Sequence, residues 1–162
     1  MTPHPNTHRL AATAVLAAAA TLALGASSLA AAPAQQRVAK RIDLVERIAS
    51  QHFVDLGKHG PSVGDHDVTR SDVLDRAGAR VGRADIDCTL TGVGPHMGGL
   101  CHGVVALRDG QIVSEFAFGP SGATRVAAVI GGAGAYAGAR GVSIVDVHGT
   151  DEHEPFTIEL FP

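Results

Sequence analysis

The sequence predicts an all-β protein whose antiparallel sheet of seven or eight strands closes into a barrel. Short runs rich in apolar and β-branched residues follow one another from about residue 65 to the C-terminus, with turns between them at fairly even spacing. One run alternates cleanly between apolar and polar residues, which is typical of a strand with one buried face. Closure is the economical arrangement because it removes exposed sheet edges, and a β-sandwich is the alternative.

The first 34 residues have the composition of a secretory signal peptide. An uncharged apolar run covers residues 10–24, and an A-x-A cleavage site ends at Ala34, with cleavage after Ala30 as a close alternative. An uncleaved anchor helix is the competing interpretation, but this alanine-rich run is short for a bilayer core of ~30 Å. We therefore expect a secreted, extracellular protein with one mature domain at residues 35–162 and no stable membrane span.

The segment 36–50 is ambiguous between helix and strand. Its residues Val38, Ile42, Val45 and Ile48 recur at helical spacing, whereas residues 42–44 alternate as in a strand. Glycine and proline mark residues 57–64 as a loop, residues 65–74 form a weakly patterned strand, and residues 75–78 form a turn.

Residues 81–90 carry the clearest strand pattern. Ala84, Ile86, Cys88 and Leu90 share one face, and Arg83, Asp85, Asp87 and Thr89 share the other. The two aspartates could act as paired carboxylates, but they lie on the hydrophilic face, which a solvated barrel exterior explains better.

Cys88 and Cys101 are the only cysteines, and an even number in an exported chain favours a disulfide. The residues 91–99 form a glycine-rich loop before a strand at 100–107. If the strands on either side pair as a hairpin, the two cysteines lie opposite each other, so the bridge would join neighbouring strands. Two buried free thiols are the alternative.

Four further strands complete the sheet. Asp109-Gly110 signals a two-residue hairpin, and the strands are expected at 111–118, 125–130, 142–147 and 156–161.

The segment 128–141 is read as a tight corner between two strands. Its glycines are Gly131, Gly132, Gly134, Gly138 and Gly141, and glycine permits positive φ and close backbone approach. The pair Gly132 and Gly134 also resembles the start of a dinucleotide fingerprint. That motif requires another glycine at position 137, which is Ala137, and then a helix, so the structural corner is preferred.

Composition argues against several classes of function. The net charge is −3 without a basic cluster, tryptophan is absent and tyrosine occurs once, so nucleic-acid binding has no electrostatic or stacking signature. His96, Cys101 and His102 are close together, but their spacing matches no zinc pattern and the disulfide would consume Cys101. We expect no metal and no cofactor.

Two residues are candidates for catalysis. Glu115 would have a raised pKa suited to acid catalysis if it faced the cavity, but the opposite register, with Phe116 and Phe118 inside, buries two aromatics and is preferred. Tyr136 could donate a hydrogen bond to a ligand, although packing over the neighbouring glycines is the favoured role.

Several motifs together resemble those of allene oxide cyclase barrels. Gly64-Asp65, Leu74-Asp75, Val81-Gly82, Cys88 and the corner at 130–141 occur in matching order. The related dirigent proteins carry a similar corner and a stretch like Val81-Gly82-Arg83-Ala84. The resemblance covers about residues 53–161, nearly all of the mature chain.

This resemblance implies an eight-stranded antiparallel barrel with an apolar cavity, often assembled as a dimer or trimer, and a long first strand at residues 41–54. Allene oxide cyclases and dirigent proteins largely use the shape of the pocket to hold a flexible substrate in a reactive conformer. The expected ligand is therefore a small hydrophobic, lipid-like or polyketide-like molecule. The protein would be an isomerase or cyclase that acts by confinement, or else a non-catalytic binding or structural barrel.

The departures from the family pattern limit what is carried over. Val68 stands where plant cyclases have a proline that helps to hold a functional water. Plant enzymes also use a first-strand glutamate, and neither Glu46 nor Asp55 matches it clearly. The resemblance therefore does not imply a plant-type cyclase activity.

Overall fold

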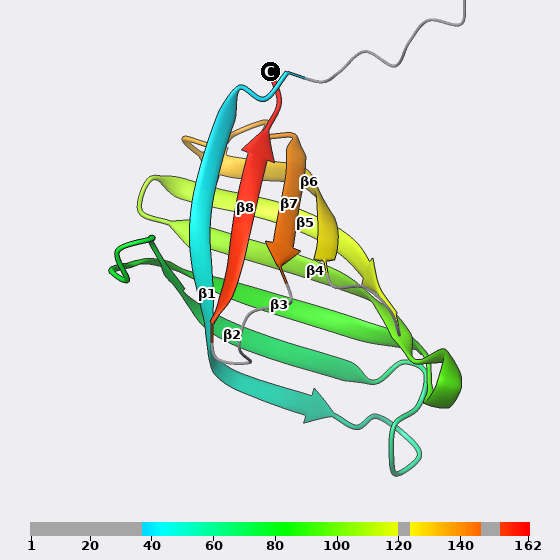
Figure 1. The fold of residues 1–162 in the computed structure, drawn as a ribbon. Coiled ribbons are helices and arrows are strands. Elements are labelled where there is room, and N and C mark those ends of the chain that lie inside the picture. The colour runs from blue at the N-terminus through cyan, green and yellow to red at the C-terminus, as the bar shows by residue number, and fades with distance from the viewer. Residues whose placement is uncertain (1–36, 120–123, 147–152) are drawn as a thin grey trace, which may run out of the picture. The chain divides into compact units, whose positions relative to one another are not determined.

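The computed structural model describes residues 37–119, 124–146 and 153–162, so the predicted signal peptide lies outside the described residues. Eight strands and one 3-10 helix occur in chain order (Figure 1). They are β1 (Lys40–Val54), β2 (His66–Leu74), β3 (Arg80–Gly92), η1 (Gly94–His96), β4 (Gly98–Leu107), β5 (Gly110–Phe118), β6 (Thr124–Gly134), β7 (Gly141–Asp146) and β8 (Glu154–Leu160). Each strand is antiparallel to its neighbours, and β1 pairs with β8, so the predicted closed barrel is confirmed.

The long first strand implied by the resemblance is confirmed. Residues 40–54 form β1, which pairs with β8 on one side and β2 on the other, so the helical interpretation of this segment is wrong. Two details differ from the sequence expectations. The hairpin turn consists of residues 108 and 109, since Leu107 pairs with Gly110. Strand β6 also continues beyond residue 130, so Gly131, Gly132 and Gly134 belong to the strand and the corner follows them.

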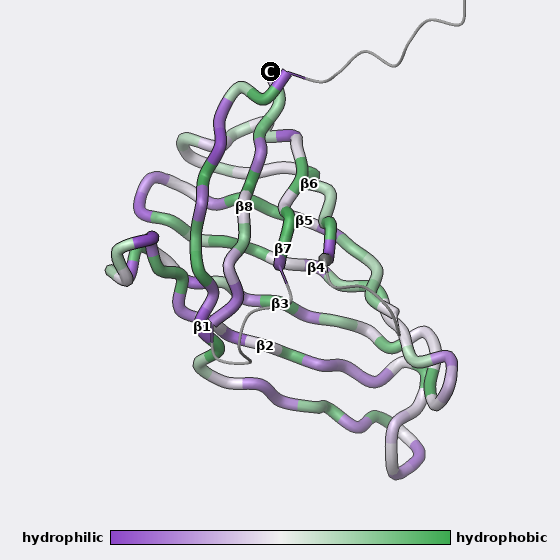
Figure 2. The backbone as a smooth tube through the Cα atoms, viewed as in Figure 1, coloured by the Kyte–Doolittle hydropathy of each residue, from purple (hydrophilic) through white to green (hydrophobic). Residues whose placement is uncertain are grey.

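Inward-facing side chains fill one end of the barrel. This core is made of Leu44, Val73, Ala84, Ile112, Val129, Tyr136, Phe156, Ile158 and Leu160. Burial of each large aliphatic side chain contributes about 1.5–3 kcal/mol. The alternation that drives this burial is visible along β2 and β3, where hydrophilic and hydrophobic residues succeed one another (Figure 2). The start of β1 and the end of β8 meet at the same end, where Ala39 N donates to Leu160 O at 2.8 Å.

The corner between β6 and β7 packs against this core. Gly134 and Gly138 have φ values of +66° and +73°, which L side chains rarely adopt. At Gly132 a Cβ would collide with the carbonyl oxygen of Tyr136 and would lie 2.6 Å from that of Gln111. Tyr136 is buried, and the Lys40 ammonium lies 4.7 Å from the centre of its ring. The structure thus places Tyr136 in the core, packed beside the corner glycines.

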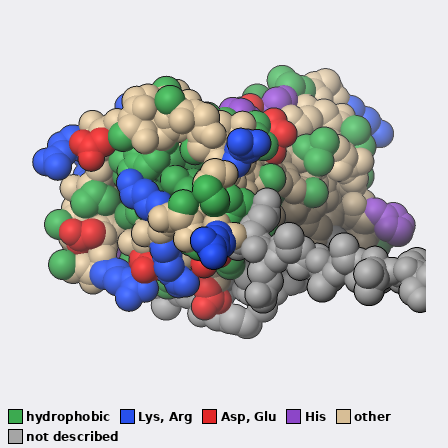
Figure 3. All heavy atoms as spheres, turned by 90° about the horizontal axis from the view of Figure 1, so that it is seen from above, with side chains coloured by type: hydrophobic (Ala, Val, Ile, Leu, Met, Phe, Trp, Pro, Cys, Tyr) green, Lys and Arg blue, Asp and Glu red, His purple; other side chains and the backbone are tan. Residues whose placement is uncertain are grey.

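Arginine–aspartate pairs cover the outer face of β1, β2 and β3. Three aspartates each lie between two arginines: Asp43 between Arg41 and Arg76, Asp72 between Arg47 and Arg80, and Asp85 between Arg70 and Arg83. Seen from the core end, Lys and Arg side chains gather on the surface (Figure 3). Such exposed pairs stabilise a fold by at most about 1 kcal/mol each. They therefore identify the solvent-exposed face of the sheet but contribute little to its stability.

The disulfide joins neighbouring strands. Cys88 of β3 and Cys101 of β4 are direct register partners with Cα atoms 4.0 Å apart, and their sulfurs are bonded. The side chains belong to the inward face, where Cys101 is almost completely buried.

Substitution of Gly132 tests the close packing at the corner. We expect Gly132→Ala to lower the free energy of unfolding by at least about 2 kcal/mol, because the added methyl group meets two carbonyl oxygens. Gly131→Ala is the matched control, since a Cβ there has no heavy atom within 4 Å. Urea denaturation of both variants measures the difference, and equal stabilities would contradict the packing argument.

The presence of the disulfide and its contribution to stability can both be tested. The mature protein should be lighter than its reduced form by two hydrogen atoms in intact mass spectrometry. Removing the bridge with the double change Cys88→Ala and Cys101→Ala should lower the free energy of unfolding by about 3 kcal/mol, because the bridge closes a loop of 13 residues. A reduced mass, or unchanged denaturation of the double variant, would refute it.

Candidate functional site

A cavity of about 570 Å³ occupies the part of the barrel interior that the core leaves open. It continues toward the core as a narrow pocket of about 50 Å³, and the two spaces share Glu46, Ile86, Phe116, Arg125 and Glu154. Small inward residues surround the narrow pocket: Ala84, Gly103, Ser114, Ala127 and Ser143. A cavity of this size lies within the range of natural small-molecule sites, ~300–1,000 Å³.

Glu46 is the buried acid of this cavity. It lies on β1 between two apolar inward residues, and its side chain is only 9% exposed. The hydroxyl of Ser71, on β2, donates to Glu46 Oε1 at 2.6 Å. Burial raises the pKa of Glu46, which the hydrogen bond from Ser71 partly opposes and the charge of Glu154 reinforces. Glu46 is thus a carboxyl group that favours the protonated form more than an exposed glutamate does.

A second carboxylate faces Glu46 across the closing strands. Glu154 on β8 is the direct register partner of Glu46 on β1, and both line the cavity. The guanidinium of Arg125, from β6, lies 3.8 Å from Glu154 Oε1. A buried acid beside an ion-paired carboxylate is an arrangement that can donate and accept protons in one site.

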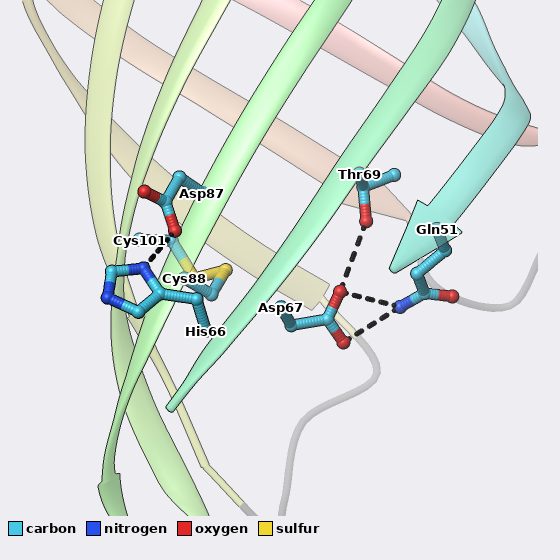
Figure 4. The surroundings of a disulfide bond; sticks show 7 residues. All are labelled: Gln51, His66, Asp67, Thr69, Asp87, Cys88 and Cys101. Carbon is cyan, nitrogen blue, oxygen red and sulfur yellow. Dashed lines mark hydrogen bonds and ion pairs between the residues drawn. A yellow bond between two sulfur atoms is a disulfide. The ribbon is translucent and has the colours of Figure 1, made fainter. Parts of the chain in front are cut away.

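The wide part of the cavity carries further polar groups. A bulge between Ile48 and Ser50 shifts the register of β1, and Gln51 lines the cavity beyond it. Its amide nitrogen donates to both oxygens of Asp67 at 3.0 and 2.9 Å, and the hydroxyl of Thr69 donates to Asp67 at 3.4 Å (Figure 4). Asp67 is therefore oriented by two neutral donors.

The opposite wall is apolar. Phe116 and Phe118 of β5, Ile86 of β3 and the Cys88–Cys101 disulfide line it. This arrangement leaves Glu115 on the outer face, where its side chain is 59% exposed and 3.6 Å from His102. The cavity role considered for Glu115 does not fit this geometry, because inward Phe116 fixes the alternation of the strand and turns Glu115 to solvent.

The other predicted polar residues also lie outside the cavity. Asp85 forms ion pairs with Arg70 and Arg83 on the outer face. Asp87 lies on the same face, with its Oδ1 2.7 Å from His66 Nδ1 (Figure 4). Cys101 is committed to the disulfide, so it offers no thiolate to the neighbouring histidines.

Sequence reasoning named Glu46 only as an acid near the position of the plant first-strand glutamate, without assigning it to the cavity, and it did not identify Glu154. Glu46 follows Ile42 and Leu44 at intervals of two residues, so it lies on the same face of the strand. This alternation could have placed it on the inward face. For Arg125 and Glu154 the sequence offers no comparable signal, because their proximity depends on how β6 and β8 meet in the closed barrel.

Comparisons with known proteins agree with this architecture. Residues 46–159 match the model of the allene oxide cyclase barrel-like domain. The structure is similar to pyocyanin demethylase, with a TM-score of 0.65, 26% identity and coverage of 75% of this chain and 99% of that chain. It is also similar in fold to a pterocarpan synthase dirigent protein (TM-score 0.60, 17% identity, coverage 75% and 86%).

An exo-specific intermolecular Diels–Alderase shares the fold as well, with a TM-score of 0.57, 18% identity and coverage of 76% and 99%. No curated protein matches the chain in sequence. Within the described residues, no helix has the length and apolar character needed to cross a membrane.

Glu46→Gln should change how stability responds to pH. The folded state raises the pKa of Glu46 above the ordinary value of 4.5, so it binds this proton more tightly than the unfolded chain. That stabilisation is fully present below pH 4.5 and is lost as the pH rises through the folded-state pKa. The melting temperature of the variant, relative to wild type, should therefore increase from about pH 4 to about pH 8.

Thermal denaturation across this pH range is the measurement. Asp109→Asn is the matched control, since this acid is 66% exposed and lies outside the cavity. A constant difference for Glu46→Gln would show that burial does not perturb this acid.

Proposed function

Because the chain belongs to the family of allene oxide cyclase barrel-like domains, we propose that its cavity binds a small, largely hydrophobic molecule and steers an isomerisation or cyclisation. The observation that carries this proposal is Glu46, a buried acid that lines the cavity beside an ion-paired carboxylate. The structural neighbours support it, since they include a pterocarpan synthase dirigent protein and a Diels–Alderase.

In this proposal the ligand lies against Phe116, Phe118 and Ile86. The protonated carboxyl group of Glu46 donates its proton to an oxygen or nitrogen of the ligand while the bonds rearrange. The carboxylate then recovers a proton from the product, so the reaction is an isomerisation without net consumption of protons. Confinement of the ligand in one conformer supplies a further part of the rate, as in other reactions within shaped pockets.

A non-catalytic binding barrel is the second candidate. One observation favours it: the polar groups of the cavity already satisfy one another, with Ser71 bonded to Glu46, Gln51 to Asp67, and Arg125 paired with Glu154. Such a network can exist to hold a polar interior together without reacting with a ligand.

We also propose that the protein is exported. The support is the signal-like segment 1–34 together with the Cys88–Cys101 disulfide, because disulfides persist in oxidising compartments. Assembly into a dimer or trimer stays a prediction from the family.

Substitution of Glu46 tests the catalytic proposal. Wild-type protein is incubated with a panel that contains an epoxy fatty acid and a linear polyene carrying a dienophile, and isomeric products are detected by liquid chromatography and mass spectrometry. For the compound that is converted, Glu46→Gln should lower kcat at least about 100-fold, because a general acid contributes ~10²–10⁴-fold. Binding should change little, and the exposed Glu115→Gln should behave as wild type.

Native mass spectrometry of protein purified from culture fluid separates the alternatives. A retained molecule that wild-type protein never converts would favour the binding barrel. Conversion that is equally fast in Glu46→Gln would overturn the role of this acid.

A further inference from the structure

The two walls of the cavity differ in character. Strands β3, β4 and β5 contribute the apolar wall, with two phenylalanine rings and the disulfide. Strands β1, β2, β6 and β8 contribute the polar wall, with Glu46, Gln51, Asp67, Thr69, Arg125 and Glu154. A ligand that fills the cavity must therefore present an apolar face to one wall and charge or hydrogen-bonding groups to the other.

The polar wall carries an excess of negative charge. Its three carboxyl groups belong to Glu46, Asp67 and Glu154, and Arg125 is the one Lys or Arg among the described residues that line it. Arg125 pairs with Glu154 at 3.8 Å. Asp67 is held by the neutral donors Gln51 and Thr69 and forms no ion pair with a Lys or Arg in the described part of the chain.

Protonation of Glu46 would reduce the negative charge of the polar wall without reversing its sign. Arg125 and Glu154 neutralise each other, and the carboxylate of Asp67 remains.

This lining favours one class of ligand. Carboxylates along low-dielectric walls focus a negative potential into a cleft, which attracts cations and repels anions. The aromatic rings opposite can stack on a planar ligand and interact favourably with its positive charge. We propose that the cavity selects a planar aromatic cation, whose ring lies against Phe116 and Phe118 and whose positive charge faces Asp67. This inference rests on the proposed binding function and assigns the class of its ligand.

Three compounds of similar shape and different charge test the inference. They are the cation N-methylacridinium, neutral acridine and the anion acridine-9-carboxylate, and each is titrated into the full mature protein at neutral pH with fluorescence detection. We expect the cation to bind at least about tenfold more tightly than acridine, and the anion more weakly than both. The preference for the cation should fall as salt is added.

Asp67 and Asp87 provide a matched pair of variants. They lie on adjacent strands, but Asp67 lines the cavity whereas Asp87 faces solvent beside His66 (Figure 4). Asp67→Asn should weaken binding of N-methylacridinium about fivefold and leave acridine binding unchanged, whereas Asp87→Asn should change neither. Circular dichroism and thermal melting confirm that both variants are folded.

The outcomes distinguish this inference from the proposed function. Equal affinities for the three compounds, or tighter binding of the anion, overturn the inference and leave cavity binding intact. Equal effects of the two aspartate variants also overturn it, since charge outside the cavity would then matter as much. Absence of binding by all three compounds overturns it too, whereas the catalytic role of Glu46 stands or falls on the turnover measurements alone.

Discussion

The pairing of β1 with β8 is the constraint on which the rest of this protein depends. Seven register pairs, from Lys40 with Leu160 to Glu46 with Glu154, close the sheet and give it an interior. Side chains alternate with a period of two, so a shift of this register by one residue would turn Glu46 outward and bring Arg47 into the barrel. Closure of the barrel therefore determines the position of the core and the inward orientation of Glu46. It also places the carboxylate of Glu154 opposite Glu46.

The interior is divided by side-chain size. Large residues such as Ile112, Phe156, Ile158 and Tyr136 fill the end beneath the β6–β7 corner. Further along, Ala84, Gly103, Ser114, Ala127 and Ser143 occupy the inward positions and leave space unfilled. The narrow pocket thus exists because small residues recur on one stretch of several strands, while the glycines at the corner let the core close tightly. Binding capacity and stability come from separate parts of one barrel.

Much of this fold could be predicted from sequence because its evidence is local. The alternation over residues 81–90 fixed the face of Cys88, and hairpin geometry then placed Cys101 opposite it. Segment 36–50 was harder, because apolar Val45 lies on the outward side between the buried Leu44 and Glu46 and obscures the period of two. The site was hardest. Glu46, Arg125 and Glu154 come from three strands that are distant in sequence, and only barrel closure brings them together.

The distribution of charge shows why composition is a poor guide to the ligand of a barrel. The chain has a net charge of −3, which argues against nucleic-acid binding but says nothing about the interior. Arginines in pairs surround Asp43, Asp72 and Asp85 on the outer face. Among the described residues that line the cavity, three carboxyl groups face one guanidinium. The two faces of β1 and β2 therefore carry opposite electrostatic character. A ligand in the cavity is shielded from the outer arginines by the sheet and lies directly against the inner acids, so the local lining governs its charge.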